Sequence, residues 1–146
     1  MSHEAYFAAL RLPDQQVNRL FKLLGARLGQ AQSGMAEITL PLSADLTQGA
    51  GLIAGGILAV LADESMAHAV LSLFAEDQRF VTVEMNIRYL RAVDPGAPGE
   101  ITATGSVIKT GKSVMFAESR ITGPDGKLLA VAGGTFTISP YSGKRS

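Results

Sequence analysis

The run GLIAGGILAVLADESMAHAVLSLF, residues 51–74, decides the fold of this chain. It predicts a long helix over residues 56–74, and because this helix is apolar nearly all round, it should be buried. The run is also long enough to suggest a membrane span, but Asp63, Glu64 and His68 lie in its middle. We therefore expect it to be the central helix of a protein that does not enter a membrane.

Turns and extended runs surround this helix. Before it, alternation over 35–40 predicts a strand that pairs with residues 26–31 through a turn at Ser33-Gly34. Further upstream, helical periodicity over 14–24, bounded by Pro13 and Gly25, predicts an amphipathic helix. After the central helix, extended runs are expected at 80–91, 100–109, 113–122 and 127–138.

The strand 80–91 should have one buried face, because its apolar and polar residues alternate. The apolar set is Val81, Val83, Met85, Ile87 and Tyr89, and the opposite set is Thr82, Glu84, Asn86 and Arg88. Turn residues between the later runs indicate a meander. Gly133-Gly134 indicates a bulge or a close backbone approach.

Together these elements predict one α+β domain, with a mostly antiparallel sheet wrapped around the central helix. We divide the chain into an N-terminal helical segment (1–24), a core (26–138) and a tail (139–146).

Composition narrows the function further. The 146 residues carry 13 basic and 13 acidic side chains, whereas a nucleic-acid-binding domain usually has a basic excess. Apolar residues make up 47% of the chain, so we expect apolar surface to be buried between subunits. The absence of cysteine excludes disulfides, zinc–thiolate sites and cysteine nucleophiles. With only two histidines and no signal-peptide pattern, we expect no metal site and a cytoplasmic location.

Asp63 is the side chain of the central helix best suited to chemistry. Half of its helical neighbours are Ala or Gly, which leaves open space beside the carboxylate. A carboxylate in such a niche can act as a general base or a nucleophile, although a helix-surface position or an inter-subunit ion pair would also explain it. Glu64 has His68 four residues later, and we expect this pair to be structural or interfacial.

The glycine-rich approach to the helix is a second candidate feature. Backbone N–H groups at a helix start carry partial positive charge, and glycine lets a ligand approach closely, so this end could stabilise an oxyanion. Asp63 lies about 12 Å further along the helix at 1.5 Å per residue, which is too far for one carbonyl group to touch both. Two antiparallel copies of the helix would bring Gly55 of one chain to Asp63 of the other, so the sequence predicts a dimer with composite sites.

Four motifs in order carry a family likeness, namely QGAGLIAGGILAVLADESMAHAV (48–70), FVTVEMNIRYLRAVDPG (80–96), KTGKS (109–113) and DGKLLAVAGGTF (125–136). The chain resembles hotdog-fold acyl-CoA thioesterases of the phenylacetate-degradation (PaaI-like) type over residues 34–138. The resemblance implies a hotdog fold, a curved antiparallel sheet around one long helix. It also implies subunits that pair through their sheets into a homodimer, or a homotetramer made of two dimers.

The resemblance also implies roles for individual residues. Asp63 matches the catalytic carboxylate, and Gly55 matches the glycine whose N–H polarises the thioester carbonyl. Gln48 matches a residue that helps to hold the carbonyl or the water, and Thr82 matches one that orients the attacking water. Positions expected to touch coenzyme A are Gly56, Tyr89, Lys109, Thr110, Gly111, Lys112, Ser113 and Val114. The family commonly has histidine where this chain has Ala54, which removes a donor near the carbonyl but leaves the main-chain N–H.

The function implied is hydrolysis of an acyl- or aryl-acyl-CoA to free acid and CoA, with no cofactor apart from the CoA of the substrate. Ala54 motivates an alternative, a non-hydrolytic acyl-CoA-binding or structural hotdog protein.

Gly111-Lys112-Ser113 also resembles the end of a phosphate loop. Position 106 is serine, however, and the motif joins two predicted strands, so a nucleotide triphosphatase is not expected. The lysines of this turn could meet the CoA phosphates, or the turn could simply be solvated. Arg88 and Arg91 lie on opposite faces of their strand, and one of them could meet phosphate.

Overall fold

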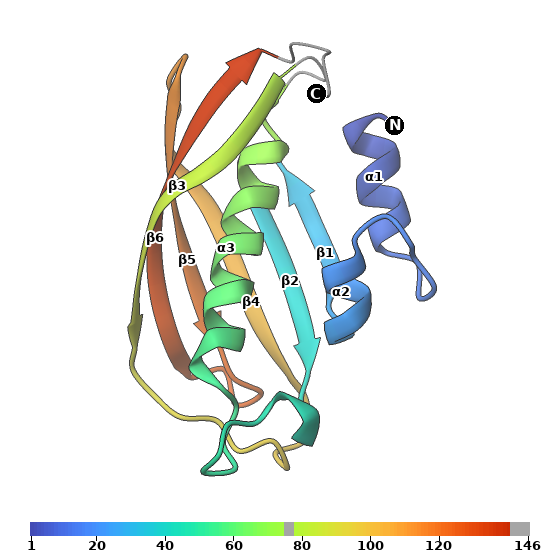
Figure 1. Ribbon diagram of the computed structural model, residues 1–146, viewed down its shortest axis with the longest axis vertical. Coiled ribbons are helices and arrows are strands. Elements are labelled where there is room, and N and C mark those ends of the chain that lie inside the picture. Colours follow the sequence, from blue (N-terminus) through green and yellow to red (C-terminus); the bar gives the residue numbers. More distant parts are fainter. Residues whose placement is uncertain (75–77, 141–146) are drawn as a thin grey trace.

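The computed structural model describes residues 1–74 and 78–140, in which one long helix lies in the concave face of a six-stranded sheet (Figure 1). The helices are α1 (His3–Leu10), α2 (Arg19–Leu24) and α3 (Gly55–Leu71), with a short 3-10 turn, η1 (Ala44–Leu46). The strands are β1 (Arg27–Gln32), β2 (Met35–Pro41), β3 (Gln78–Tyr89), β4 (Glu100–Lys109), β5 (Val114–Thr122) and β6 (Leu128–Pro140). Each expected strand is present within two residues of its predicted ends, whereas α3 stops three residues before Phe74.

The sheet order is β1-β2-β4-β5-β6-β3, with every neighbouring pair antiparallel. The prediction of a meander through all four later strands is therefore wrong for the first of them, because β3 pairs with β6 and leaves β2 to pair with β4. The connection over 90–99 contains Pro95 and Pro98 and is longer than the two to five residues of a usual hairpin loop. This connection carries the chain across the sheet, so β3 becomes an edge strand.

The helix α3 lies directly on the sheet at two glycines. A Cβ added at Gly105 would lie 2.2 Å from the Ser65 carbonyl oxygen, and one added at Gly134 would lie 3.0 Å from the Met66 Cε atom. The expected close approach at Gly133-Gly134 is thus present. Beside Gly105, the Ser65 hydroxyl hydrogen-bonds that of Ser119 on β5 at 2.8 Å, so polar contact is kept where the backbones meet.

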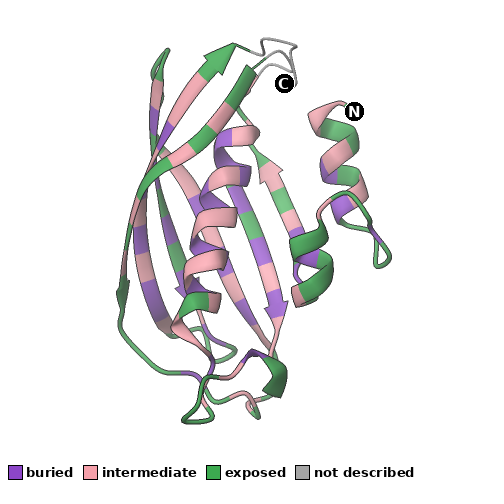
Figure 2. Cartoon of the chain, in the orientation of Figure 1, coloured by how far each residue is buried: buried purple, intermediate pink, exposed green. Residues whose placement is uncertain are grey.

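The burial of residues along α3 reflects its position on the sheet. The face of α3 toward the sheet is buried, and the opposite face is intermediate or exposed (Figure 2). Over the part of the chain that the structure describes, no helix combines the length and apolar character needed to cross a membrane.

The inward-facing set of β3 differs from the predicted one. The ladder with β6 shifts register between Thr82 and Glu84, which makes Val83 the extra residue of a β-bulge. Val81 and Val83 are consequently 61% and 54% exposed, whereas Met85 and Ile87 pack against the core as expected. The prediction of one continuous apolar face is therefore wrong for the first half of the strand, and it is Thr82 that points inward there.

The N-terminal segment 1–24 contains two short helices. The prediction of one helix over 14–24 is wrong in its first half, because α2 begins at Arg19. Its N-cap, Asn18, accepts hydrogen bonds through Oδ1 from two N–H groups of the first turn at 3.1 Å, and such a cap starts a helix. Gly25 ends α2 as expected, with a left-handed φ of 72°.

Candidate active site

Asp63 lies on the half-exposed side of α3 and is paired with a hydroxyl from the sheet. The Thr82 Oγ1 donates a hydrogen bond to the Asp63 Oδ1 at 2.8 Å. The bulge at Val83 makes this bond possible, because a regular strand with Met85 inward would turn Thr82 away from the helix. One carboxylate oxygen is thereby held in place, and the carboxylate can orient or deprotonate a bound water molecule.

The start of α3 has no side-chain cap. Ala54 is the N-cap residue, with an extended φ of −65° and ψ of 136° and no side-chain hydrogen bond. The first N–H of the helix to find an intrahelical acceptor is that of Ile57, which donates to the Ala54 carbonyl at 3.0 Å. The N–H groups of Gly55 and Gly56 come before it and have no intrahelical partner. A Cβ added at Gly56 would meet no atom within 4 Å, so a ligand oxygen has room to approach these donors.

Tyr89 covers Gly55, the glycine that precedes Gly56. Its hydroxyl donates a hydrogen bond to the Gly55 carbonyl at 3.0 Å, and a Cβ added at Gly55 would lie 3.3 Å from its ring. Half of Tyr89 remains exposed, so its ring can still contact a ligand at the helix start.

Gln48 lies in the loop before α3, at the Gly55 end of the helix. Its side-chain carbonyl accepts a hydrogen bond from the Ala50 N–H, and its main-chain N–H donates to the Leu52 carbonyl at 2.9 Å. The side chain therefore closes its own turn and is exposed. In a single chain, the structure thus gathers Gln48, Gly55, Gly56 and Tyr89 at one end of α3, apart from the Asp63–Thr82 pair.

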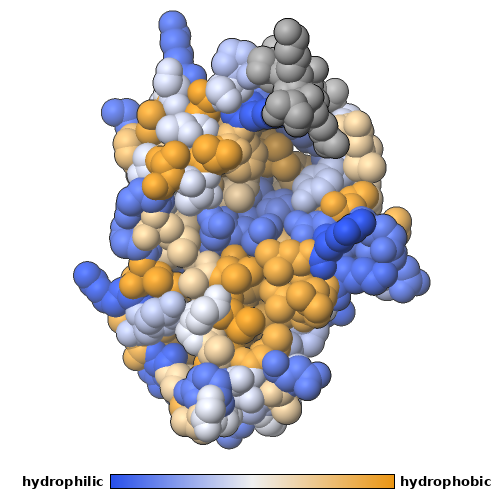
Figure 3. Space-filling model, viewed as in Figure 1, coloured by the Kyte–Doolittle hydropathy of each residue, from blue (hydrophilic) through white to orange (hydrophobic). Residues whose placement is uncertain are grey.

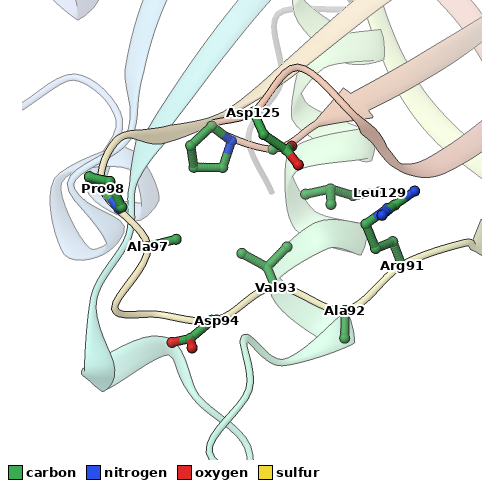
Figure 4. A pocket seen from close by; sticks show the side chains of 10 residues that line it. Arg91, Ala92, Val93, Asp94, Ala97, Pro98, Asp125 and Leu129 are labelled. Carbon is green, nitrogen blue, oxygen red and sulfur yellow. The ribbon is translucent and has the colours of Figure 1, made fainter.

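Two pockets border the segment that follows β3. The first, about 350 Å³, has Gly55 and Tyr89 at its wall, with Ile53, Leu58 and Val93 also lining it. The second, about 400 Å³, lies between this segment and the β5–β6 turn (Figure 4). Arg91 lines both pockets, whereas Arg88 lines a separate hollow on the sheet, bordered by residues of β3, β4, β5 and β6. Of the two arginines, only Arg91 therefore lies beside the helix start.

The predicted CoA-binding turn lies at the other end of the sheet. Val114 pairs with Thr137, whereas Tyr89 pairs with Ala130, seven residues or roughly 23 Å away along β6. The other five turn residues are exposed, namely Lys109, Thr110, Gly111, Lys112 and Ser113. Within one chain, this turn and the Gly55 end of α3 cannot share a small ligand.

Comparison with known proteins identifies the family. The model of the Thioesterase superfamily matches residues 50–130, which include α3 and most of the sheet. The chain belongs to the thioesterase superfamily. Membership agrees with the hotdog arrangement of sheet and helix described above, and it makes a thioesterase-type hydrolase the general class of this protein.

Individual relatives of this thioesterase-superfamily chain cover most of its length. An esterase candidate from Saccharolobus solfataricus is 30% identical over 125 residues, which are 85% of this chain and 86% of the relative. A 1,4-dihydroxy-2-naphthoyl-CoA hydrolase from Listeria monocytogenes is 26% identical over 119 residues, 82% of this chain and 94% of that protein.

Solved structures extend the likeness. The conserved protein PA5202 from Pseudomonas aeruginosa has a TM-score of 0.77 and 33% identity, and the match covers 84% of this chain and 94% of that one. The PaaI protein from the phenylacetic acid degradation operon of Escherichia coli has a TM-score of 0.75 and 27% identity, with 82% and 83% covered. The resemblance to PaaI-like thioesterases is thus confirmed.

Sequence reasoning missed two parts of this thioesterase-superfamily site. Leu58 and Val93 line the pocket at Gly55, but in the sequence they are ordinary apolar residues of a buried helix and a loop. The Glu64–His68 pair was predicted and is present at 3.5 Å, but the contacts that Tyr6 and Asn18 of the N-terminal segment add to it were missed. In the sequence, the one sign of these contacts was Asn18, a helix-capping residue type in the middle of the run 14–24 that was predicted to be helical.

Proposed function

We propose that this protein hydrolyses the thioester bond of an acyl-CoA, giving a free acid and CoA. The hydrogen bond from Thr82 to Asp63 carries the proposal, because it fixes a carboxylate beside small residues on the open side of the central helix. The uncapped helix start at Gly55 supports it by offering donors for an oxyanion. The naphthoyl-CoA hydrolase among the relatives points to the same bond. The direct test is an assay of thiol release across short, long and aromatic acyl-CoA substrates.

The reaction can follow a general-base route. Asp63 takes a proton from water while the water oxygen attacks the carbonyl carbon, and the Gly55 N–H stabilises the negative charge on the carbonyl oxygen. When the carbon–sulfur bond breaks, the CoA thiolate leaves and receives the proton held by Asp63. Thr82 keeps the carboxylate aligned, and Gln48 holds the carbonyl or the water.

In the nucleophilic route, Asp63 itself attacks the carbonyl and forms an anhydride that water then opens. Label enters Asp63 during a single turnover in oxygen-18 water only by this route, when the water attacks the aspartyl carbonyl of the anhydride, so its detection in the protein by mass spectrometry identifies the nucleophilic route.

The proposed site is completed by a second copy of the chain. Gly55 and Asp63 are about 12 Å apart along one helix, so both can act on one carbonyl only if two antiparallel helices lie side by side. The edge strand β3 is suited to this pairing, because Val81 and Val83 are exposed along it. Apolar side chains also gather over the lower half of α3 (Figure 3). Burial of these surfaces would favour association.

We expect the purified protein to be a homodimer, or a homotetramer built from two such dimers. Light scattering at micromolar concentration should give at least twice the 15.3 kDa mass of one chain, because each site needs residues from two copies. A monomeric mass in a preparation that hydrolyses acyl-CoA would contradict the composite site.

Replacing both Lys109 and Lys112 with Ala is expected to raise KM for acyl-CoA. Both lysines are exposed on a turn far from Gly55 of the same chain, where they can contact the nucleotide phosphates of a substrate held largely by the other copy. Hydrolysis of a truncated pantetheine thioester, which lacks those phosphates, should be nearly unchanged. Equal losses on both substrates would instead place the turn in folding or at the reacting centre.

A second candidate function is non-hydrolytic binding of acyl-CoA. It is favoured by Ala54, whose methyl group supplies no donor at the N-cap where the family commonly has histidine. Tight binding of acyl-CoA in calorimetry, with no thiol release from any substrate, would support this function and exclude hydrolysis.

A further inference from the structure

A histidine on the catalytic helix is buried by the N-terminal segment. His68 is 3% exposed, and its ring lies within 5.3–6.2 Å, centroid to centroid, of three aromatic rings. These rings belong to Tyr6 and Phe7 of α1 and to Phe21 of α2. Three aromatic side chains of residues 1–24 therefore pack onto α3 around this one imidazole.

A chain of hydrogen bonds runs through the same contact. The Glu64 carbonyl can only accept, so His68 donates to it from Nδ1, at 2.7 Å. His68 Nε2 is then the acceptor for the Tyr6 hydroxyl at 3.4 Å, and that hydroxyl accepts from the Asn18 side-chain amide at 3.2 Å. Asn18 is itself held by Gln15, whose side chain bonds both its N–H and its carbonyl, at 2.9 and 2.8 Å. This network needs a neutral imidazole, because a protonated ring would present a second N–H to the tyrosine hydroxyl.

Glu64 belongs to the same cluster. Its Oε2 lies 3.5 Å from the His68 Nδ1 atom. The nearby Asn18 amide lowers the pKa of Glu64 and so opposes part of the larger effect of burial. Burial, assisted by the neighbouring charge of Asp63, raises the pKa of Glu64 from 4.5 to about 7. Burial lowers the pKa of His68. The titratable groups that face Glu64 are Asp63 and His68 on α3 and Tyr6 on α1, while α2 contributes the neutral amide of Asn18.

We propose that Tyr6, Asn18, Glu64 and His68 form a pH-sensitive latch that fastens the N-terminal segment to the helix carrying Asp63. The segment supplies the side chains that bury Glu64 and His68, so docking favours the uncharged form of both. By linkage, charging either residue must loosen the segment to the same extent. Because Glu64 directly follows Asp63, docking of the segment is coupled to the charge beside the proposed catalytic carboxylate.

The two residues act in opposite directions on the pH scale. The pKa of Glu64 is raised, so its contribution to docking is fully present below pH 4.5 and is lost as pH rises through about 7. The pKa of His68 is lowered, so its contribution is present above its ordinary value of 6.5 and is lost as pH falls. The latch is therefore strongest in mildly acidic to neutral solution, and each residue partly masks the pH dependence of the other.

Hydrogen–deuterium exchange of the full chain tests the latch without any substrate. Glu64→Gln keeps the size of the side chain and its uncharged state, so comparison with wild type isolates the ionisation of Glu64. For amides of α1 and α2, the ratio of protection in Glu64→Gln to that in wild type should rise between about pH 6 and pH 8.5, by up to roughly tenfold. Amides of β4 and β5 are the internal control, and their ratio should stay constant.

Tyr6→Phe is the second variant, because it keeps the stacked ring and removes the hydroxyl that links Asn18 to His68. It should lower the protection of α1 and α2 at both pH values. A Glu64→Gln ratio that changes by less than about twofold over this range, or equal changes in β4 and β5, would overturn the latch. So would unaltered protection in Tyr6→Phe. None of these results depends on thioesterase activity, so failure of the latch and failure of the proposed function are separate outcomes.

Discussion

Replacing Asp63 with Asn is expected to lower kcat for acyl-CoA hydrolysis by at least about a hundredfold, since general-base catalysis alone is typically worth 10²–10⁴-fold. The amide keeps the size of the side chain and can still contact Thr82, but it is neither a base nor a nucleophile. KM should change little, because the Gly55 donor and the CoA contacts stay in place. Steady-state kinetics, together with calorimetric binding of acyl-CoA to the inactive variant, measure both effects.

Glu64→Gln is the matched control for this substitution. It makes the same chemical change one residue later, about 100° round the helix, on a side chain that faces Asn18 and His68 and not Thr82. Its kcat should fall far less than that of Asp63→Asn. An inactive Glu64→Gln together with an active Asp63→Asn would show that the wrong carboxylate has been assigned.

Replacing Gly105 with Ala is expected to destabilise the fold by about 3 kcal/mol, the upper part of the usual range for overpacking a core. The new methyl group would lie 2.2 Å from the Ser65 carbonyl oxygen and 2.3 Å from its carbon. Both atoms belong to the backbone of α3, so no side-chain rotation can relieve the clash. Thermal unfolding should show Tm lowered by roughly 6–12 °C.

Gly49→Ala is the control for this effect. Gly49 lies in the loop before α3, where an added Cβ meets no atom within 4 Å and the backbone does not have a positive φ. Its Tm should stay close to that of wild type. If Gly105→Ala were equally harmless, α3 would have to sit further from β4 than the structure places it.

Local patterns in the sequence were sufficient for most of the elements but not for their pairing. Alternation placed the strands within two residues, because each strand has one side toward the core. The position of β3 depends on a crossing over 90–99 that brings it to β6, and no local pattern encodes that partner. Periodicity over 14–24 predicted too long a helix, because the Asn18 cap can start a helix within an apparently amphipathic run.

The candidate site shows the same limit. The small residues around Asp63 and the glycines before α3 are visible in the sequence, and they led to both halves of the proposed site. Thr82 was indicated only by the family resemblance, since simple alternation placed it on the outer face of its strand. The latch as a whole could not be predicted, because Tyr6 and Asn18 lie some 50 residues before Glu64, in a segment whose docking depends on tertiary packing.

The bulge at Val83 makes the shape of a backbone part of the candidate active site. The same twelve residues of β3, drawn out as an unbroken ladder, would present valine methyl groups to Asp63 in place of a hydroxyl. The hydrogen bond from Thr82 to Asp63 thus depends on the position of the extra residue in β3. A variant in which the bulge moved would lose this bond although every polar side chain of the site was still present. An alignment that compares only residue letters would judge such a variant intact.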